Sequence, residues 1–441
     1  MKVKALSRST SDYVRERAQD THKVQRNLDP ALHPFEKGRE YVRALNTVKL
    51  ERLFAKPFVG ALSGHIDGVY SMAKHPQKLS SIISGSGDGE LRVWDLSEQA
   101  TTWRTKGHTS IVNGVCAGHH TGQFLSCSSD KTVKIWNQSV GTDPIETYMG
   151  KNAFTGLTHH RSDPIFATSG HTVDVWDETR SDPIHSFEWG ADSYQTVKFN
   201  QVETNILASC GQDRTIVLYD LRTSKPLSKL VMAMKTNAIA WNPMEAFIFT
   251  AGSEDHNAYT FDMRNMKAAQ NILKDHVSAI LDVDYSPTGQ EIVTGSYDRT
   301  LRIYNSRSGH SRDAYHTKRM QRIFCVQFSM DSKYVLSGSD DGNIRLWKAK
   351  ASEKLGVKDW REKNHLEYAA KLKERYSHMD EIKRIDRHRH TPYGVKRADS
   401  IKKEMLSAQK RKEDNRRKHS KKGTEEKRVS EREKAIIGIA K

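Results

Sequence analysis

The chain has 441 residues and a formal net charge of +17, with 71 Lys and Arg against 54 Asp and Glu. No apolar run is long enough to span a membrane, and the first residues lack the apolar region of a secretory signal. The thiols are scattered without a Cys-x-x-Cys pair, which favours a reducing compartment over disulfides or zinc. They are Cys116, Cys127, Cys210 and Cys325. Composition therefore predicts an intracellular protein with no membrane partner.

The positive charge is concentrated at both ends of the chain. Residues 1–60 hold 13 Lys and Arg against 7 Asp and Glu, a net of +6, and residues 351–441 hold 28 against 16, a net of +12. The middle, 61–350, is left with 30 against 31, a net of −1. Two basic segments flanking a neutral region predict an acidic partner, most often a nucleic acid.

Residues 1–55 are predicted to form a basic N-terminal arm. A short helix is expected over Ser11–Gln25, and a second, amphipathic helix over Arg39–Phe54. The following segment, Lys56–Leu62, has the composition of a β-strand.

A module first seen at Ser84–Leu96 then repeats along the chain. It combines a small-residue turn, an Asp, an alternating apolar run and an aromatic residue six positions after the Asp. The Asp and aromatic pairs are Asp88 and Trp94, Asp130 and Trp136, Asp213 and Tyr219, Asp255 and Phe261, Asp298 and Tyr304, and Asp341 and Trp347. A seventh copy ends at Trp176, with Gly170 in place of the Asp. Successive aromatic residues lie 42, 40, 43, 42, 43 and 43 positions apart.

This period predicts an all-β fold, a seven-bladed WD-repeat β-propeller over residues 56–350. No strand-like segment follows Trp347. We therefore expect Lys56–Leu62 to supply the outer strand of the last blade, which closes the ring and removes its open edge.

Each module also carries polar residues at fixed positions. A His lies 22 to 25 residues before the Asp in four repeats, and a Ser or Thr lies four residues before it in five. This pattern resembles the His–Ser/Thr–Asp–Trp network of WD repeats and matches best in repeats one, two and seven. The residues are His65, Ser84, Asp88 and Trp94; His108, Ser126, Asp130 and Trp136; and His316, Ser337, Asp341 and Trp347. A set repeated in many blades indicates a structural role and not a catalytic triad.

The remaining motifs exclude several kinds of chemistry. Gly85–Gly89 is a turn without the helix and Lys-Ser/Thr of a phosphate-binding loop. His388 and His390 lie among arginines, whose charge opposes a divalent cation. No nucleophile has a credible base. The sequence therefore predicts a non-enzyme without cofactor, metal or small-molecule substrate, and disfavours a metabolic enzyme.

Two blade ends carry an aromatic-Asp-x-Arg sequence. It resembles the motif by which propellers dock onto the adaptor of cullin-four ubiquitin ligases. The candidate docking residues are Tyr219, Asp220, Arg222, Asp262 and Arg264. The alternative is that both arginines are ordinary surface residues of a turn.

Residues 351–441 are predicted to form a basic helical tail. One helix is expected over Asp359–Ser377, and a second from Asp399 or Ser400 to Gly423. The candidate RNA-binding residues are Lys383, Arg384, Arg387, Arg389, Lys410, Arg411, Lys412, Arg416, Arg417, Lys418, Lys421 and Lys422. Few aromatic residues are interleaved, so the pattern favours phosphate contacts over base stacking. The alternative is a solvated face or a nuclear import signal.

Three segments carry a closer resemblance: Asn27–Glu36, Trp347–Gly356 and Ile382–His390. They resemble the Sof-one family of WD-repeat proteins, called cullin-four-associated factor thirteen in animals, and the resemblance covers nearly the full chain. It implies a nucleolar scaffold of the small-subunit processome that works with the U3 small nucleolar ribonucleoprotein in 18S rRNA processing and 40S subunit biogenesis.

The partners implied by the resemblance are pre-ribosomal proteins, U3 snoRNA and pre-rRNA. It also implies a second role as a substrate receptor of a cullin-four RING ubiquitin ligase. The distribution of charge favours the first role, because ribosomal precursors are polyanions.

Overall fold

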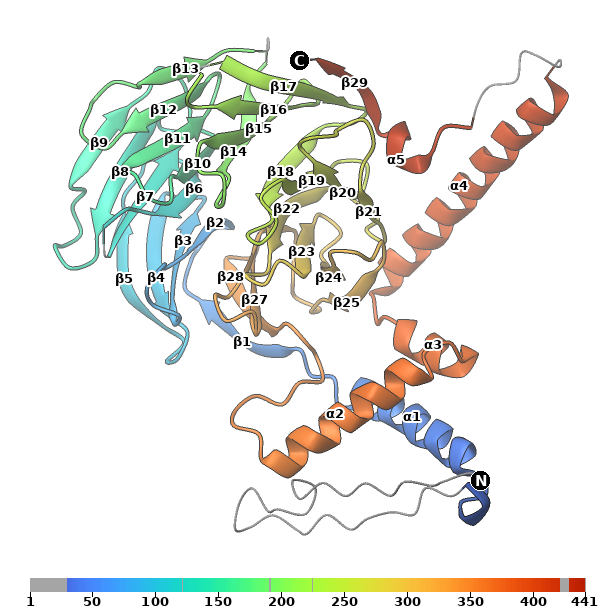
Figure 1. Ribbon diagram of the computed structural model, residues 1–441. Coiled ribbons are helices and arrows are strands. Elements are labelled where there is room, and N and C mark those ends of the chain that lie inside the picture. The colour runs from blue at the N-terminus through green and yellow to red at the C-terminus, as the bar shows by residue number, and fades with distance from the viewer. Residues whose placement is uncertain (1–29, 121, 190–191, 224, 421–427, 441) are drawn as a thin grey trace, which may run out of the picture. The chain divides into compact units, whose positions relative to one another are not determined.

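A computed structural model describes residues 30–120, 122–189, 192–223, 225–420 and 428–440. The described chain forms two compact units, one of residues 30–56 and 352–388 and the other of residues 57–351 and 389–440 (Figure 1). This division differs from the expected arm, propeller and tail, because the tail is shared between the units. The helix expected over Ser11–Gln25 lies outside the described residues.

The larger unit is built on seven antiparallel sheets, which confirms the predicted propeller (Figure 1). Blade one comprises β2 (Val69–Lys74), β3 (Ser81–Ser86), β4 (Glu90–Asp95) and β5 (Ala100–Lys106). Blade two comprises β6 (Val112–Ala117), β7 (Gln123–Ser128), β8 (Thr132–Asn137) and β9 (Glu146–Met149). Blade three comprises β10 (Gly156–His159), β11 (Ile165–Ser169), β12 (Val173–Asp177) and β13 (His185–Phe187). Blade four comprises β14 (Tyr194–Phe199), β15 (Ile206–Gly211), β16 (Thr215–Asp220) and β17 (Lys225–Met232).

The ring continues in the same order. Blade five comprises β18 (Thr236–Trp241), β19 (Ile248–Ser253), β20 (Ala258–Asp262) and β21 (Asn271–Leu273). Blade six comprises β22 (Ile280–Tyr285), β23 (Glu291–Ser296), β24 (Leu301–Asn305) and β25 (Ser311–Tyr315). Blade seven comprises β26 (Ile323–Phe328), β27 (Tyr334–Ser339), β28 (Asn343–Lys348) and β1 (Phe58–Ser63). The second strand of each blade is almost wholly buried, because neighbouring sheets pack against both of its faces.

The N-terminal strand closes the ring as predicted. β1 pairs antiparallel with β28, with Phe58 opposite Trp347 and Ala61 opposite Arg345. The backbone N–H of Lys348 donates to the carbonyl of Pro57 at 2.8 Å. This pairing covers the outer edge of β28 and joins the two ends of the propeller in one sheet.

A second set of bonds joins each blade to the next. At every boundary, a side chain on or just before the inner strand of one blade bonds the backbone of its neighbour. Six of the side chains donate to a carbonyl: Ser71 to Val112 at 3.2 Å, Asn113 to Phe154 at 2.6 Å, Thr155 to Tyr194 at 2.5 Å, Thr196 to Asn237 at 2.7 Å, Asn237 to Ile280 at 2.9 Å and Cys325 to Val69 at 3.4 Å. At the remaining boundary the carboxylate of Asp282 accepts from the N–H of Val326 at 2.8 Å.

The predicted polar network is complete in blade two. The Nδ1 of His108 lies 2.9 Å from the Asp130 carboxylate, and its Nε2 lies 2.7 Å from the hydroxyl of Ser126. Trp136 donates to the same hydroxyl at 2.8 Å. The network therefore joins the loop before the blade, the second strand, the third strand and the turn between them.

Blade six has the same His–Asp connection, although its motif matches less well. His276 lies 2.9 Å from Asp298 and 2.7 Å from Thr294, and its side chain is fully buried. The aromatic hydroxyl of Tyr304 donates instead to the carbonyl of Lys274 at 2.6 Å.

In blade one the predicted role of Asp88 is wrong. His65 bonds Ser84 at 2.7 Å, and Trp94 donates to Ser84 at 2.8 Å, as expected. However, the Nδ1 of His65 faces Glu90 at 3.4 Å, and the Asp88 carboxylate accepts only the backbone N–H of Glu90, at 3.1 Å. Asp88 therefore stabilises the turn and is not a hydrogen-bond partner of His65.

In blade seven the predicted role of His316 is also wrong. Its ring stacks on His390 at a centroid distance of 5.3 Å, so Ser337 is bonded only by Trp347, at 2.9 Å. Asp341 accepts from the guanidinium of Arg345 at 3.1 Å, which replaces the missing imidazole with a buried cation.

The smaller unit consists of a 3-10 turn and three helices, η2 (Pro30–Leu32), α1 (Glu36–Leu53), α2 (Trp360–Arg375) and α3 (Asp380–Arg387). α1 and α2 confirm the two amphipathic helices expected here. The three helices pack around four buried residues, which are Ala44 and Val48 of α1, Leu372 of α2 and Ile382 of α3. Lys373 links all three helices, because its ammonium lies 2.9 Å from Glu51 and 2.7 Å from Asp386.

The rest of the tail belongs to the propeller unit. α4 (Tyr393–His419) begins six or seven residues earlier than predicted, directly after Pro392, whose φ of −55° already suits the first turn. α5 (Glu431–Lys434) and β29 (Ile436–Ala440) follow. β29 was not predicted; it pairs antiparallel with β17 and makes blade four five-stranded (Figure 1).

Candidate nucleic-acid and partner-binding surfaces

The second half of α4 carries most of the predicted basic residues. Five of their side chains are exposed: Lys410, Arg411, Lys412, Arg416 and Lys418. At 3.6 residues per turn they spread around the helix, which suits contact with phosphates from more than one side. Lys421 and Lys422 lie outside the described residues.

The acidic residues within this cluster are engaged by other cations. Arg417 pairs with Asp414 at 2.7 Å, so it does not add a free charge to the surface. Glu413 lies 2.9 Å from Lys434 of α5, whose hydrogen bond lowers the pKa of this carboxyl. Since both carboxylates are neutralised by neighbours within the unit, the exposed face keeps a strong positive charge.

A second basic surface lies on α3, in the smaller unit. Lys383, Arg384 and Arg387 are exposed, whereas Ile382 is buried against α1 and α2. Asp386 is held by Lys373 on the inner side. The helix therefore exposes its three cations, while two of its three carboxylates are engaged within the unit, Asp386 by Lys373 and Glu381 by the hydroxyl of Tyr41 at 2.9 Å.

Arg389, also predicted to bind RNA, is tied to the propeller. Its Nε donates to the carbonyl of Ser311 at 3.3 Å, beside the stacked rings of His316 and His390. Further along, Lys402 donates to the carbonyl of His276 at 3.0 Å. These contacts position α4 on blades six and seven. The contact of Lys402 was not predicted from the sequence, because a lysine that bonds a loop carbonyl cannot be told from any other lysine in a basic run.

The two aromatic-Asp-x-Arg motifs adopt the same geometry. Arg222 bonds Asp220 through its backbone N–H at 2.9 Å and through Nε and Nη2 at 3.2 Å. Burial alone would raise the pKa of Asp220, but the bonds from Arg222 outweigh it and lower the pKa. The Arg222 side chain remains 66 % exposed, while Tyr219 is buried and bonded to Ser209 at 3.2 Å.

At the end of blade five, Arg264 repeats these contacts with Asp262, at 3.0, 3.1 and 2.9 Å. Its hydrogen bonds lower the pKa of Asp262. The guanidinium also lies 4.4 Å from the ring centre of Phe247, and the side chain is 64 % exposed. Each motif thus holds an exposed arginine in a fixed orientation at the end of a blade strand.

Metal-ligating side chains and cysteine thiols of the described residues bear on the chemistry that the protein supports. Within the described ranges, no cluster of three or more His, Cys, Asp or Glu could hold a metal ion. Burial raises the pKa of Cys116 and of Cys210 to about 12, and that of Cys325 well above its usual value. These thiols are therefore neutral at physiological pH. None of the helices described is long and apolar enough to cross a membrane.

The fold and the basic tail define a WD-repeat propeller with a specialised C-terminal region. WD domain, G-beta repeat models match residues 56–95, 99–137 and 314–348, and a Sof1-like domain model matches residues 349–436. A eukaryotic translation initiation factor eIF2A model matches residues 162–309, inside the propeller.

Three curated relatives illustrate the family. DDB1- and CUL4-associated factor 13 of Xenopus laevis is 53 % identical over 96 % of both chains. Protein SOF1 of Saccharomyces cerevisiae is 51 % identical over 99 % of this chain and 95 % of its own length. The human DDB1- and CUL4-associated factor 13 is 51 % identical over the full length of both chains. The chain belongs to this family of Sof1-like WD-repeat proteins, as the sequence resemblance predicted.

Proposed function

We propose that this protein is a non-catalytic scaffold of the small-subunit processome, which associates with the U3 small nucleolar ribonucleoprotein in the nucleolus and is needed for 18S rRNA processing and 40S subunit biogenesis. The observation that carries this proposal is the exposed cationic face of α4, whose acidic neighbours are engaged by Arg417 and Lys434. It lies within the Sof1-like match.

In this proposal the propeller is a platform for pre-ribosomal proteins and the basic helices bind U3 snoRNA or pre-rRNA. Phosphate contacts fix position without reading sequence, so specificity comes from the assembled particle. Because A-form RNA presents a deep, narrow groove lined with phosphates, a helix with cations on several sides fits its backbone better than its base edges.

The test is RNA binding at several salt concentrations. A variant with Lys410, Arg411, Lys412, Arg416 and Lys418 changed to Gln is compared with wild type on structured RNAs of unrelated sequence. Each lost phosphate contact lowers the slope of log K against log salt concentration by about 0.7. If about half of the five residues contact phosphates, the variant's slope should therefore be lower by about 2. Binding should weaken similarly for every RNA.

A matched control removes the same charge from the propeller. It changes to Gln five of the exposed lysines of the propeller, Lys78, Lys106, Lys151, Lys267 and Lys350. If α4 is the RNA contact, this control keeps the wild-type slope. If α4 is instead a nuclear import signal, its Gln variant binds RNA normally in vitro and is retained in the cytoplasm of cells. An unchanged salt slope in the α4 variant would contradict RNA binding by α4 and would leave α3 or the N-terminal arm as the RNA contact.

A second candidate function is that of a substrate receptor for a cullin-four RING ubiquitin ligase. The names of several relatives contain DDB1 and CUL4, and the two exposed arginines with fixed orientation are the surface that favours this function. Arg222→Ala with Arg264→Ala should reduce co-purification of the ligase adaptor and leave the association with ribosome precursors intact.

Blade three provides the control for this experiment. Its strand also ends in Trp176-Asp177, but Thr179 occupies the place of the arginine and bonds Asp177 at 2.9 Å. Arg180→Ala in the same turn should leave adaptor binding unchanged. Equal loss in the control, or loss of both associations in the double variant, would indicate damage to the propeller instead of a docking site.

A further inference from the structure

Residues 430–440, which include α5 and β29, are attached to the propeller. Ala435 is 6 % exposed and packs with Met232, Met266 and Ile272 of blades four and five. The backbone N–H of Ala233 donates to the Ala435 carbonyl at 2.8 Å, and that of Ala269 donates to the Arg432 carbonyl at 3.0 Å. α5 and β29 thus attach through a small core and a few backbone bonds.

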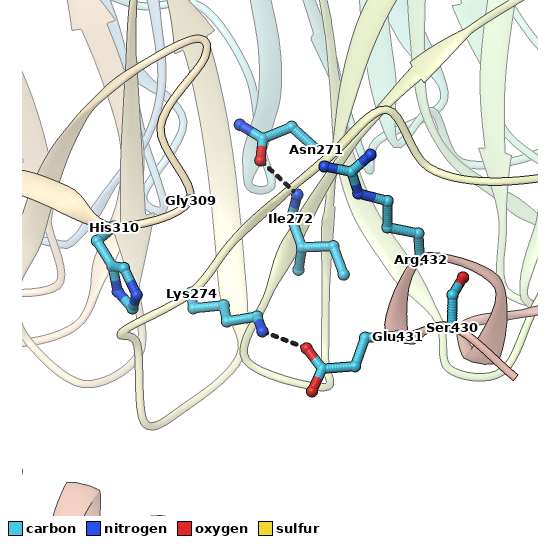
Figure 2. A pocket seen from close by; sticks show the side chains of 8 residues that line it. All are labelled: Asn271, Ile272, Lys274, Gly309, His310, Ser430, Glu431 and Arg432. Carbon is cyan, nitrogen blue, oxygen red and sulfur yellow. Dashed lines mark hydrogen bonds and ion pairs between the residues drawn. The ribbon is translucent and has the colours of Figure 1, made fainter. Parts of the chain in front are cut away.

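A cavity of about 360 Å³ lies beside α5, between the ends of blades five and six (Figure 2). It is lined by Asn271, Ile272, Lys274, Gly309, His310, Ser430, Glu431 and Arg432. Figure 2 shows the Lys274 ammonium reaching across to Glu431, whose pKa this contact lowers. Two permanent cations, Lys274 and Arg432, therefore line the cavity against one carboxylate.

Ser430 is the one hydroxyl side chain in this lining. It is exposed and precedes the first residue of α5, yet it makes no side-chain capping bond to the helix. Lys427 and Arg428 precede it by three and two positions in the sequence. Two basic residues at those positions form the pattern that basophilic serine/threonine kinases prefer.

The same pattern occurs at Ser420, and the structure distinguishes the two serines. Arg417 and Lys418 precede Ser420 at the same positions, but its hydroxyl donates to the carbonyl of Arg417 at 2.7 Å. It lines no part of the cavity. Ser430 therefore combines an uncommitted hydroxyl with nearby cations, and Ser420 does not.

We propose that Ser430 is a phosphorylation site and that the cavity beside it holds the phosphate through Lys274 and Arg432. The Ser430 oxygen attacks the γ-phosphorus of ATP in a basophilic kinase, the bond to the bridging oxygen breaks, ADP leaves and the hydroxyl proton passes to the kinase base. The product carries a charge of about −2, so it competes with Glu431 for Lys274 and draws Arg432 inward. Phosphorylation thereby fastens α5 and β29 to blades four and five.

The first experiment treats the full-length protein with ATP and the catalytic subunit of cAMP-dependent protein kinase, and maps the phosphate by peptide mass spectrometry. We expect label on Ser430, lost in Ser430→Ala and retained in Ser420→Ala. Label on Ser420 alone, or no label, would overturn the assignment.

The second experiment measures hydrogen exchange at the amides of Ala233 and Ala269, which donate to the carbonyls of Ala435 and Arg432. Phosphorylation should slow their exchange about tenfold, the factor expected from one added charge-assisted hydrogen bond. In Lys274→Ala with Arg432→Ala, the label should persist and the slowing should disappear, each variant being compared with its own unphosphorylated form. Unchanged or faster exchange in the phosphorylated wild type would show that the cavity does not hold the phosphate. Neither result depends on RNA binding.

Discussion

Blades one and two share a sequence motif but differ in how their polar residues connect. In blade two His108 joins Asp130 and Ser126, whereas in blade one His65 joins Ser84 and faces Glu90. The His lies 22 residues before the Asp in blades two and six, where the pair forms, and 23 or 25 residues before it in blades one and seven, where it does not. One extra residue in a blade is enough to change the partner of a buried imidazole.

The largest effect expected from this difference is the loss of Asp130. Asp130→Ala removes the partner of a buried imidazole. The free energy of unfolding should therefore fall by about 1–3 kcal/mol, the cost of an unsatisfied buried group. The measurement is the midpoint of urea unfolding, with Asp143→Ala, an exposed position of the same blade, as control. Equal midpoints for the two variants would show that the His108–Asp130 bond adds little.

Blade three lacks both the His and the Asp of the polar network, so that only the bond from Trp176 to Thr168, at 2.9 Å, remains of it. We expect its amides to exchange about tenfold faster than those of blade two, since about one hydrogen bond of stabilisation is missing. Native-state hydrogen exchange resolved by blade checks this. Exchange as slow as in blade two would mean that packing alone stabilises it.

His65 also makes the stability of blade one depend on pH. Burial, followed by the charge of Arg92, lowers the pKa of His65 to about 4, and the unfolded chain keeps a value near 6.5. Below pH 6.5 only the unfolded state gains this proton, so stability falls as the pH drops towards 4. Wild type should lose about 1 kcal/mol more than His65→Asn between pH 6.5 and 5.5. Parallel pH profiles would show that His65 takes up its proton equally in both states.

The smallest effect is expected at Asp88. Its carboxylate accepts one backbone N–H, and the imidazole of His65 faces Glu90 instead. Asp88→Ala should therefore change stability by less than about 0.5 kcal/mol, as expected for a surface position. A loss as large as that of Asp130→Ala, measured under the same conditions, would restore the network that the sequence motif predicts.

The sequence predicted the propeller well because its signals are local. Alternating apolar residues and an aromatic residue every 40 to 43 positions define the blades, and the absence of a strand after Trp347 indicated that β1 closes the ring. The partners of polar side chains depend on loop length. The longer segment between His316 and Asp341 lets this His stack on His390, and motif spacing alone does not reveal that partner.

The tail was harder to predict for a different reason. A helix over most of α4 was evident, but its start depends on Pro392, which serves as the first cap instead of a break. β29 is a five-residue apolar stretch after a charged helix, and only the edge of β17 makes it a strand. Similarly, the sequence identified the basic residues of the candidate site, but not that Arg417 and Arg389 are committed to contacts within the unit.

The pairing of β1 with β28 also fixes an order of events during synthesis. Ala61 is synthesised before any of the blade strands that follow β1, whereas its partner Arg345 is among the last residues of the propeller to be synthesised. At the usual rate of translation the first strand waits about 15–60 s for that partner. Until then its apolar residues and unpaired backbone are open to other chains. A nascent chain interrupted before β28 retains this exposed strand, so the protein is expected to need chaperone protection throughout its own translation.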